Sequence, residues 1–173
     1  MKKFILICIC FSVWLSALPA DAESKKVIGW LEMVRIYPGN LKMRAKMDTG
    51  AKSSSINVYK LQKFERAGET WINFEIREKT KNKKGKSATF EKKVIDSVKI
   101  KKKGGGLEER IVVKLEICLA GVHKEIEVGL LDRSNFHYQV LIGRTDLENI
   151  FVIDPAEVFT HKPDCKITVK MDQ

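Results

Sequence analysis

The strongest constraint on the fold is an alternation of apolar and polar side chains with a period of two. In residues 41–47 every second residue is apolar, and the residues between them are Lys42, Arg44 and Lys46. Successive side chains of a β-strand point to opposite faces, so a strand with one buried face produces this pattern. The segment therefore predicts a half-buried strand.

The alternation returns in later segments that turn-forming residues separate. These segments are residues 71–76, 94–100 and 111–118. Ala120-Gly121 then predicts a tight turn into residues 122–130, which gives a β-hairpin. Short strands separated by turns are typical of an all-β barrel or sandwich.

Helical patterns are confined to two short segments, residues 145–149 and residues 58–66. Neither is long enough to build a helical core. The chain of 173 residues, 44% of them hydrophobic, has the size and apolar content of one ordinary domain. We therefore expect an all-β domain of one lobe, residues 23–173.

The first 22 residues have the pattern of a secretory signal peptide. Lys2 and Lys3 form a basic start, residues 4–18 an apolar run, and Ala20-Asp21-Ala22 a small-x-small cleavage site. The run is shorter than the ~20 residues that a membrane span needs, although a retained anchor is the alternative. We expect cleavage, a periplasmic or secreted protein, and no membrane span afterwards.

The chain is basic, with 32 Lys and Arg against 22 Asp and Glu residues and a formal net charge of +10. A basic surface favours acidic partners. For an exported protein these are an anionic peptide, a cell-wall polymer or lipid headgroups rather than nucleic acid. A surface that only keeps the protein soluble is the alternative.

Two basic connectors separate strand candidates, residues 79–86 and 101–106. The first is either a plain exposed loop or a flap over a site. As a flap it would place Lys81, Lys83 and Lys84 in contact with a substrate.

Cys118 and Cys165 remain once the leader is removed. An oxidising compartment would allow them to pair. Two cysteines do not define a disulfide scaffold, so the sequence leaves the pairing open.

The candidate catalytic residue is Asp48, which follows the strand 41–47 and precedes Thr49 and Gly50. A tight turn here can hold the carboxylate toward a water molecule, and Gly50 permits the close backbone approach. Aspartic proteases use two such carboxylates that share a proton. Since the chain carries one, a twofold homodimer must bring Asp48 of both subunits together. A turn that merely ends a strand is the alternative.

A second motif stands far downstream, where three apolar residues precede Gly143-Arg144. With Asp48-Thr49-Gly50, it makes the chain similar to the retropepsin-like aspartic proteases known as ATP-dependent zinc proteases. The matching segments are Gly29-Trp30-Leu31-Glu32, Met47-Asp48-Thr49-Gly50-Ala51-Lys52-Ser53-Ser54, Glu108-Glu109-Arg110, Leu131-Asp132-Arg133-Ser134, Leu141-Ile142-Gly143-Arg144-Thr145 and Phe151-Val152-Ile153-Asp154-Pro155.

The resemblance implies a closed β-barrel of one lobe, with a short helix after the Gly-Arg motif. It implies a dimeric endopeptidase with Asp48 catalytic, Thr49, Gly50 and Ala51 supporting the turn, and Gly143-Arg144 beside it. Members occur beside ATP-grasp ligases that add glutamate to proteins, so glutamate-rich or isopeptide substrates are implied. The alternative is a non-catalytic exported module that binds acidic peptides or cell-wall polymer.

The family name suggests ATP and zinc, but the residues support neither. A phosphate-binding loop needs a glycine five positions before Gly85-Lys86-Ser87, and residue 80 is Thr. His123, His137 and His161 lack the spacing of metal ligands. We expect no metal and no cofactor; metal-dependent hydrolysis is a further alternative.

One position departs from viral retropepsins, which carry an aspartate that pairs with the arginine of the Gly-Arg motif. Lys52 stands there instead. Arg144 must find another acceptor, and the candidates are Asp146, Asp154 or a carboxylate of the other subunit.

Overall fold

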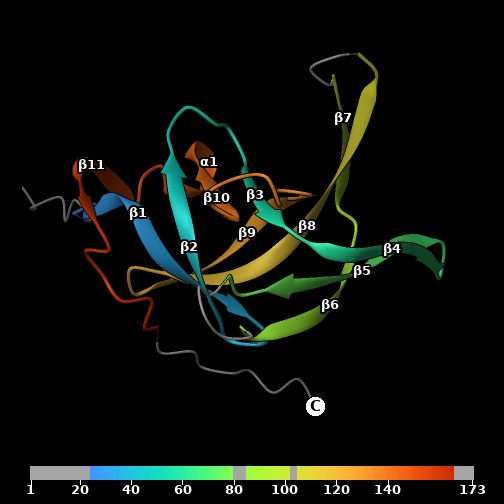
Figure 1. Cartoon of the computed structure of the whole chain (residues 1–173), viewed down its shortest axis with the longest axis horizontal. Coiled ribbons are helices and arrows are strands. Elements are labelled where there is room, and N and C mark those ends of the chain that lie inside the picture. The colour runs from blue at the N-terminus through green and yellow to red at the C-terminus, as the bar shows by residue number, and fades with distance from the viewer. Residues whose placement is uncertain (1–23, 80–84, 102–104, 166–173) are drawn as a thin grey trace, which may run out of the picture.

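The computed structural model describes residues 24–79, 85–101 and 105–165. Within them the chain forms eleven strands and one helical turn (Figure 1). In chain order these are β1 (Lys26–Tyr37), β2 (Leu41–Asp48), β3 (Ser54–Asn57), β4 (Tyr59–Arg66), β5 (Glu69–Arg77), β6 (Ser87–Lys93), β7 (Asp96–Lys101), β8 (Leu107–Leu119), β9 (Val122–Leu131), β10 (Val140–Gly143), α1 (Arg144–Leu147) and β11 (Phe151–Val158).

The main sheet closes into a barrel. Its strand order is β11-β1-β2-β10-β3-β9-β8-β7, and β1 also pairs with β8. The extra pairing joins Val34 to Leu119 and Tyr37 to Glu116, so β1, β2, β10, β3, β9 and β8 form a closed six-stranded barrel. The closure uses one half of β1 and one half of β8, while β11 and β7 pair with the other halves and stay at the two ends of the sheet. The expected all-β barrel is confirmed.

The period-two patterns define the inner face of the barrel. On β2, Leu41, Met43, Ala45 and Met47 are buried in the core, while the lysines and arginine between them reach solvent. The prediction of a half-buried strand that ends at the catalytic candidate is therefore confirmed for this segment.

A second sheet, β4-β5-β6, packs against the barrel. Its apolar side chains, including Ile72 and the stacked rings of Phe74 and Phe90, join the same core. The helix predicted for residues 58–66 is wrong, because this segment forms β4 and pairs with β5, as in Phe64 with Trp71. A helix this short is marginal by itself, and a neighbouring strand satisfies the same backbone groups.

Two other local predictions, the hairpin turn and the short helix, agree with the structure, while the strand expected at residues 94–100 begins only at Asp96 as β7. Ala120 and Gly121 both have positive φ, 50° and 82°, the requirement of a two-residue hairpin turn between β8 and β9. The helix expected after Gly143 is α1, which ends at Leu147 because the backbone leaves the helical region at Glu148.

The end of the described chain returns to the barrel. Cys118 of β8 and Cys165 form a disulfide with a Cα–Cα distance of 5.9 Å, which answers the question that the sequence left open. Arg35 of β1 adds an ion pair with Asp164 at 2.9 Å. Residues 1–22, predicted as a leader, lie outside the described residues. Within the part described, no helix has the length and apolar character to cross a membrane.

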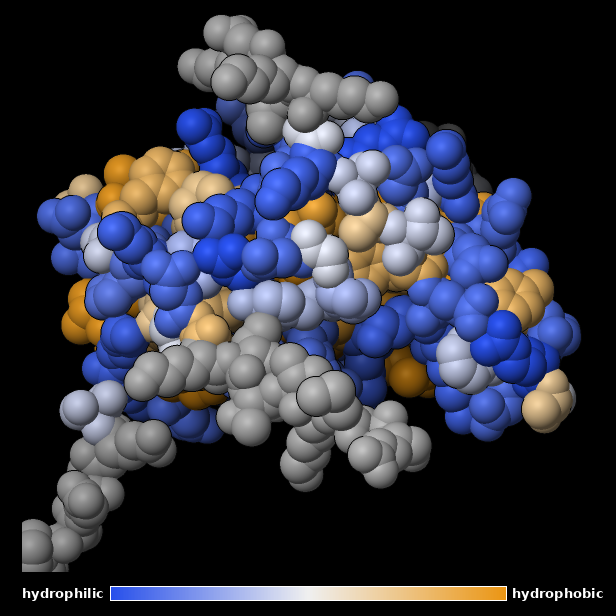
Figure 2. Space-filling view, turned by 90° about the horizontal axis from the view of Figure 1, so that it is seen from below, coloured by the Kyte–Doolittle hydropathy of each residue, from blue (hydrophilic) through white to orange (hydrophobic). Residues whose placement is uncertain are grey.

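Polar and charged side chains dominate the surface seen in Figure 2, and apolar residues appear there as separate patches. The exposed apolar side chains include Val27 and Val152, which are register partners on β1 and β11.

Candidate functional site

The two sequence motifs meet at the ends of two adjacent strands. β10 runs parallel to β2, and Gly143 is the register partner of Asp48. Residues almost a hundred positions apart in sequence therefore form one local structure. The barrel topology alone brings them together.

The Asp48 carboxylate is held by the turn that follows it. The backbone N–H of Gly50 donates to Asp48 Oδ1 at 3.1 Å, and that of Ala51 donates to the Asp48 carbonyl at 3.1 Å. Lys46, two residues earlier on the same face of β2, places Nζ 3.4 Å from Asp48 Oδ2. The Asp48 side chain remains 24% exposed, so a water molecule or a substrate can reach it.

The start of α1 fixes the outer side of the turn. Arg144 Nη1 donates to the Thr49 carbonyl at 2.7 Å, and the Arg144 N–H donates to the Ala51 carbonyl at 2.9 Å. Thr145 donates twice to the Lys52 carbonyl, from its N–H at 3.1 Å and its hydroxyl at 3.0 Å. The loop after Asp48 is thus bonded along its length to the Gly-Arg motif.

Arg144 does not use either acceptor expected within the chain. Asp146 is buried and hydrogen-bonded to Ser54, and Asp154 accepts the N–H of Ala156. A guanidinium can donate to a carbonyl as well as to a carboxylate, which explains how Arg144 holds the turn without an aspartate at position 52. A carboxylate of the other subunit stays a prediction.

A buried polar cluster that sequence reasoning missed supports Gly143. Ser54 Oγ donates to Asp146 Oδ2 at 2.5 Å and accepts from the Gly143 N–H at 3.0 Å. Lys124 lies 3.5 Å from Asp146 Oδ1. A Cβ at Gly143 would lie 2.5 Å from the carbonyl carbon of Ser53, so only glycine fits against this loop.

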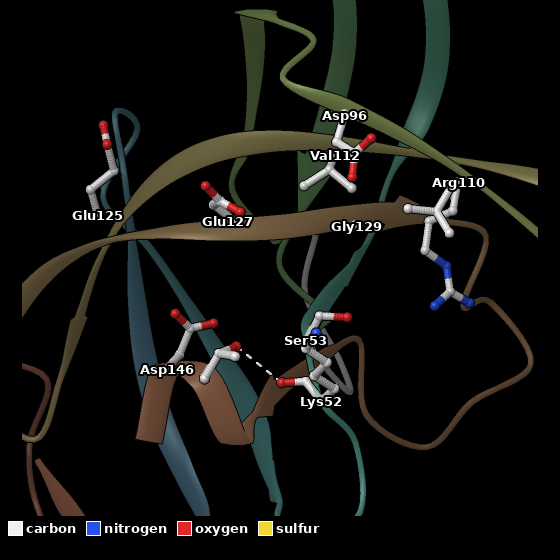
Figure 3. A pocket seen from close by; sticks show the side chains of 11 residues that line it. Lys52, Ser53, Asp96, Arg110, Val112, Glu125, Glu127, Gly129 and Asp146 are labelled. Atoms are coloured by element: carbon white, nitrogen blue, oxygen red, sulfur yellow. Dashed lines mark hydrogen bonds between the residues drawn. The ribbon is translucent and has the colours of Figure 1, made fainter. Parts of the chain in front are cut away.

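The loop that follows Asp48, residues 49–53, is the site loop. A cavity of about 510 Å³ lies beside it, lined by Lys52 and Ser53 of this loop. Figure 3 shows the two sides of this cavity: α1 and the site loop form one side, and β7, β8 and β9 form the other. Its lining carries both charges: Asp96, Glu125, Glu127 and Asp146 against Lys52 and Arg110, with Ser53, Val98, Val112, Gly129 and Thr145 between them.

Arg133 is a further charged residue near the site that sequence reasoning did not assign. It is 8% exposed, and its Nη1 donates to Ser55 Oγ at 3.0 Å. Burial lowers the pKa of Arg133, the neighbouring Arg110 lowers it further, and the Asp48 carboxylate raises it. Arg133 is therefore within electrostatic range of Asp48. Its signal in the sequence is the family-like segment Leu131-Asp132-Arg133-Ser134.

The predicted flap residues Lys81, Lys83 and Lys84 lie outside the described residues. Directly before this connector stands Glu78, whose Oε1 accepts from the Lys42 N–H at 2.8 Å. Lys42 begins the exposed face of β2, six residues or ~20 Å of strand away from Asp48. A substrate contact by these lysines stays a prediction.

The described residues contain no group of three or more His, Cys, Asp or Glu side chains placed to hold a metal ion. His123 lies against Tyr37 and 3.5 Å from Glu116, while His161 contacts Thr160. Both remaining cysteines are in the disulfide. The zinc of the family name therefore has no fitting ligand set in this part of the chain.

A closed barrel with an Asp-Thr-Gly turn beside an apolar-Gly-Arg strand defines the retropepsin-like class. The profile of the family described as retropepsin-like aspartic endopeptidase RimB matches residues 27–164. The chain belongs to this RimB-like family, which confirms the resemblance drawn from the motifs.

Similar proteins include two probable alpha-L-glutamate ligases. The one from Shewanella halifaxensis is 36% identical over 117 residues, which are 68% of this chain and 25% of that protein. The one from Desulfotalea psychrophila is 32% identical over 136 residues, 77% of this chain and 29% of that protein. The chain thus spans about a quarter of the length of these relatives.

A solved structure has the same fold. It is a Legionella pneumophila protein of unknown function, with a TM-score of 0.67 and 31% sequence identity, and the match covers 80% of this chain and 100% of that one.

Proposed function

We propose that the protein is an aspartic endopeptidase that hydrolyses peptide or isopeptide bonds as a homodimer, with Asp48 of the two subunits forming one catalytic pair. The observation that carries the proposal is the geometry of Asp48: a partly exposed carboxylate at a strand end, with one oxygen fixed by the Gly50 N–H. Membership of a retropepsin-like endopeptidase family supports the same chemistry.

The reaction needs one ionised and one protonated Asp48. The ionised carboxylate takes a proton from water while the water oxygen attacks the scissile carbonyl carbon, and the protonated one donates to the carbonyl oxygen. The tetrahedral intermediate then breaks its C–N bond: the Asp48 carboxyl that took the proton from water donates it to the leaving nitrogen, and the other Asp48 carboxylate takes a proton back from a hydroxyl of the intermediate. The products are a carboxylic acid and an amine, and no cofactor is consumed.

The two supports of the turn have separate roles in this scheme. Gly50 and Ala51 hold the carboxylate and its backbone from the inside of the turn. Arg144 holds the Thr49 carbonyl from the outside. A fixed carboxylate orientation matters because small displacements of a catalytic group are costly to the rate.

We infer an acidic substrate, including glutamate-rich chains. The net charge of +10 favours an anionic partner. The similar ligases carry alpha-L-glutamate in their names, although this chain matches only about a quarter of each. With the predicted leader, the site of action is the periplasm or the extracellular space.

The test is peptide release from a mixed peptide library that includes glutamate-rich chains, with a chelator present. We expect cleavage by the wild-type protein and a loss of about a hundred- to ten-thousand-fold in Asp48→Asn, the contribution of a positioned acid-base group. Equal cleavage by both proteins would overturn the proposal. No cleavage by either one, from folded protein, would favour the non-catalytic binding module.

A further inference from the structure

Two of the family-like segments have no part in the mechanism above, and each carries an arginine to the same place. Arg110 of β8 packs over Gly129 of β9, where a Cβ would lie 2.8 Å from Arg110 Cδ. Gly129 is the register partner of Ser55 on β3, and the Ser55 hydroxyl binds the guanidinium of Arg133. The register of β3, β8 and β9 therefore brings both arginines together.

Neither guanidinium has a carboxylate partner among the side chains that the structure describes. Arg133 donates to neutral groups, Ser55 Oγ and the Tyr138 carbonyl, and stacks on the Phe136 ring at 4.4 Å. Arg110 Nε is buried without a hydrogen-bond partner. Buried guanidinium groups are normally paired, because leaving one unpaired costs free energy.

Arg110 lies close to the loop that follows Asp48. Arg110 lines the cavity beside the site loop together with Ser53, and Figure 3 shows its side chain extending past Gly129 toward the side where Ser53 lies. The Asp48 carboxylate is in electrostatic range of Arg133 but makes its own contacts with Gly50 and Lys46. Four carboxylates line the same cavity as Arg110, but Glu125 pairs with Lys114 and Asp146 with Lys124, and no ion pair among the described side chains joins any of the four to Arg110. The guanidinium donors of the pair are thus left for another anion.

We propose that Arg110 and Arg133 form a carboxylate-binding subsite that selects one acidic position of the peptide substrate. This inference rests on the proposed function. A guanidinium fork matches the geometry of a carboxylate and can bind it through two hydrogen bonds. Phe136, 53% exposed, covers one face of Arg133, so an incoming carboxylate would meet the edge of the guanidinium.

The carboxylate has two sources, a glutamate side chain or the free end of a peptide. Three probes separate them: acetyl-hexaglutamate amide, acetyl-hexaglutamine amide, and acetyl-hexaglutamine with a free terminal carboxylate. Binding is measured by calorimetry with the full-length Asp48→Asn protein, which removes cleavage from the readout. We expect one of the two carboxylate-bearing probes to bind at least about tenfold more tightly than the neutral amide, the scale of one charge-assisted contact.

The subsite variants are Arg110→Gln and Arg133→Lys in the Asp48→Asn background. Arg110→Gln removes the charge of a half-buried side chain. Arg133→Lys keeps the positive charge but loses the planar guanidinium that can bind a carboxylate through two hydrogen bonds. We expect each to lower the preference for the carboxylate-bearing probe by about tenfold. Arg66→Gln, which loses an ion pair with Glu91 in the separate β4-β5-β6 sheet, is the matched control and should keep the preference. Thermal unfolding of each variant verifies folding.

A preference that both subsite variants retain in full would overturn the inference, as would an equal loss in the Arg66→Gln control. Failure of the subsite and failure of the proposed peptidase function give different results. Wild-type cleavage with an unchanged preference in both variants would reject the subsite and keep the peptidase. Loss of the preference in a protein that cleaves nothing would keep the subsite and reject the peptidase.

Discussion

Asp48 depends on contacts from residues that are distant in sequence. The turn itself supplies the Gly50 N–H, but Ser54 and Asp146 fix Gly143, and Gly143 lies directly beside Asp48 in the sheet. The sequence indicated Asp48 and the Gly-Arg motif through their residue types. It could not indicate the Ser54-Asp146 contact, because 92 positions separate the two residues and only the barrel register joins them.

Ser54→Ala tests this support. The substitution leaves the Gly143 N–H and one oxygen of the buried Asp146 without their partner, so we expect the free energy of unfolding to fall by about 1–3 kcal/mol. Urea denaturation measures it. Ser53→Ala, one residue earlier and exposed, is the control and should change the stability little. An equal effect of both substitutions would contradict the role given to Ser54.

At the scale of elements, the alternation of apolar and polar side chains predicted strands well. The short helical patterns were less reliable, because one of the two segments forms a strand. β2 has one neighbour on each side and one face in the core, so its pattern alone identifies it. β4 is largely exposed and has few buried side chains to mark a period of two. Its pairing with β5 decides its conformation, and pairing between segments is invisible in a local pattern.

Glu75 of β5 gives this second sheet a pH dependence. Hydrogen bonding to Arg77 is the largest cause that lowers the pKa of Glu75 from 4.5 to about 2, and Lys60 adds to it against the effect of burial. A carboxyl with a lowered pKa stabilises the fold fully above its unfolded value of 4.5, and this contribution is lost as the pH falls toward 2.

The expected outcome is that wild type has a higher melting temperature than Glu75→Gln at pH 6 and that the gap closes as the pH falls toward 2, as measured by circular dichroism. In an Arg77→Gln background, which removes the largest cause of the lowered pKa of Glu75, the gap at pH 6 should be smaller. A difference between wild type and Glu75→Gln that stays constant over the whole range would refute the assignment.

At the scale of the whole molecule, the barrel and the disulfide act together. Closure between β1 and β8 makes the barrel, and the Cys118–Cys165 bond ties the segment after β11 onto β8. The sequence predicted the all-β class and the resemblance predicted the closed barrel. Whether the cysteines pair depends on the approach of residues 47 positions apart, which sequence spacing does not reveal.

Cys118→Ser tests the contribution of this bond. A disulfide that closes a loop of this length restricts the unfolded chain, so we expect a loss of about 2–4 kcal/mol in the free energy of unfolding. Denaturation of the wild type with and without a reductant provides the comparison, and the reductant should leave the stability of Cys118→Ser unchanged. If the reductant lowered the free energy of unfolding of Cys118→Ser as much as that of the wild type, the loss of stability would not come from this disulfide.

The central claim is that one active site needs Asp48 from two subunits. The most direct test mixes wild-type protein with a growing excess of Asp48→Asn protein, allows the subunits to exchange, and measures the cleavage rate at constant wild-type amount. A shared site predicts that the inactive subunits capture the active ones, so a tenfold excess lowers the rate to about one tenth. A rate that stays unchanged after verified exchange would contradict the shared site.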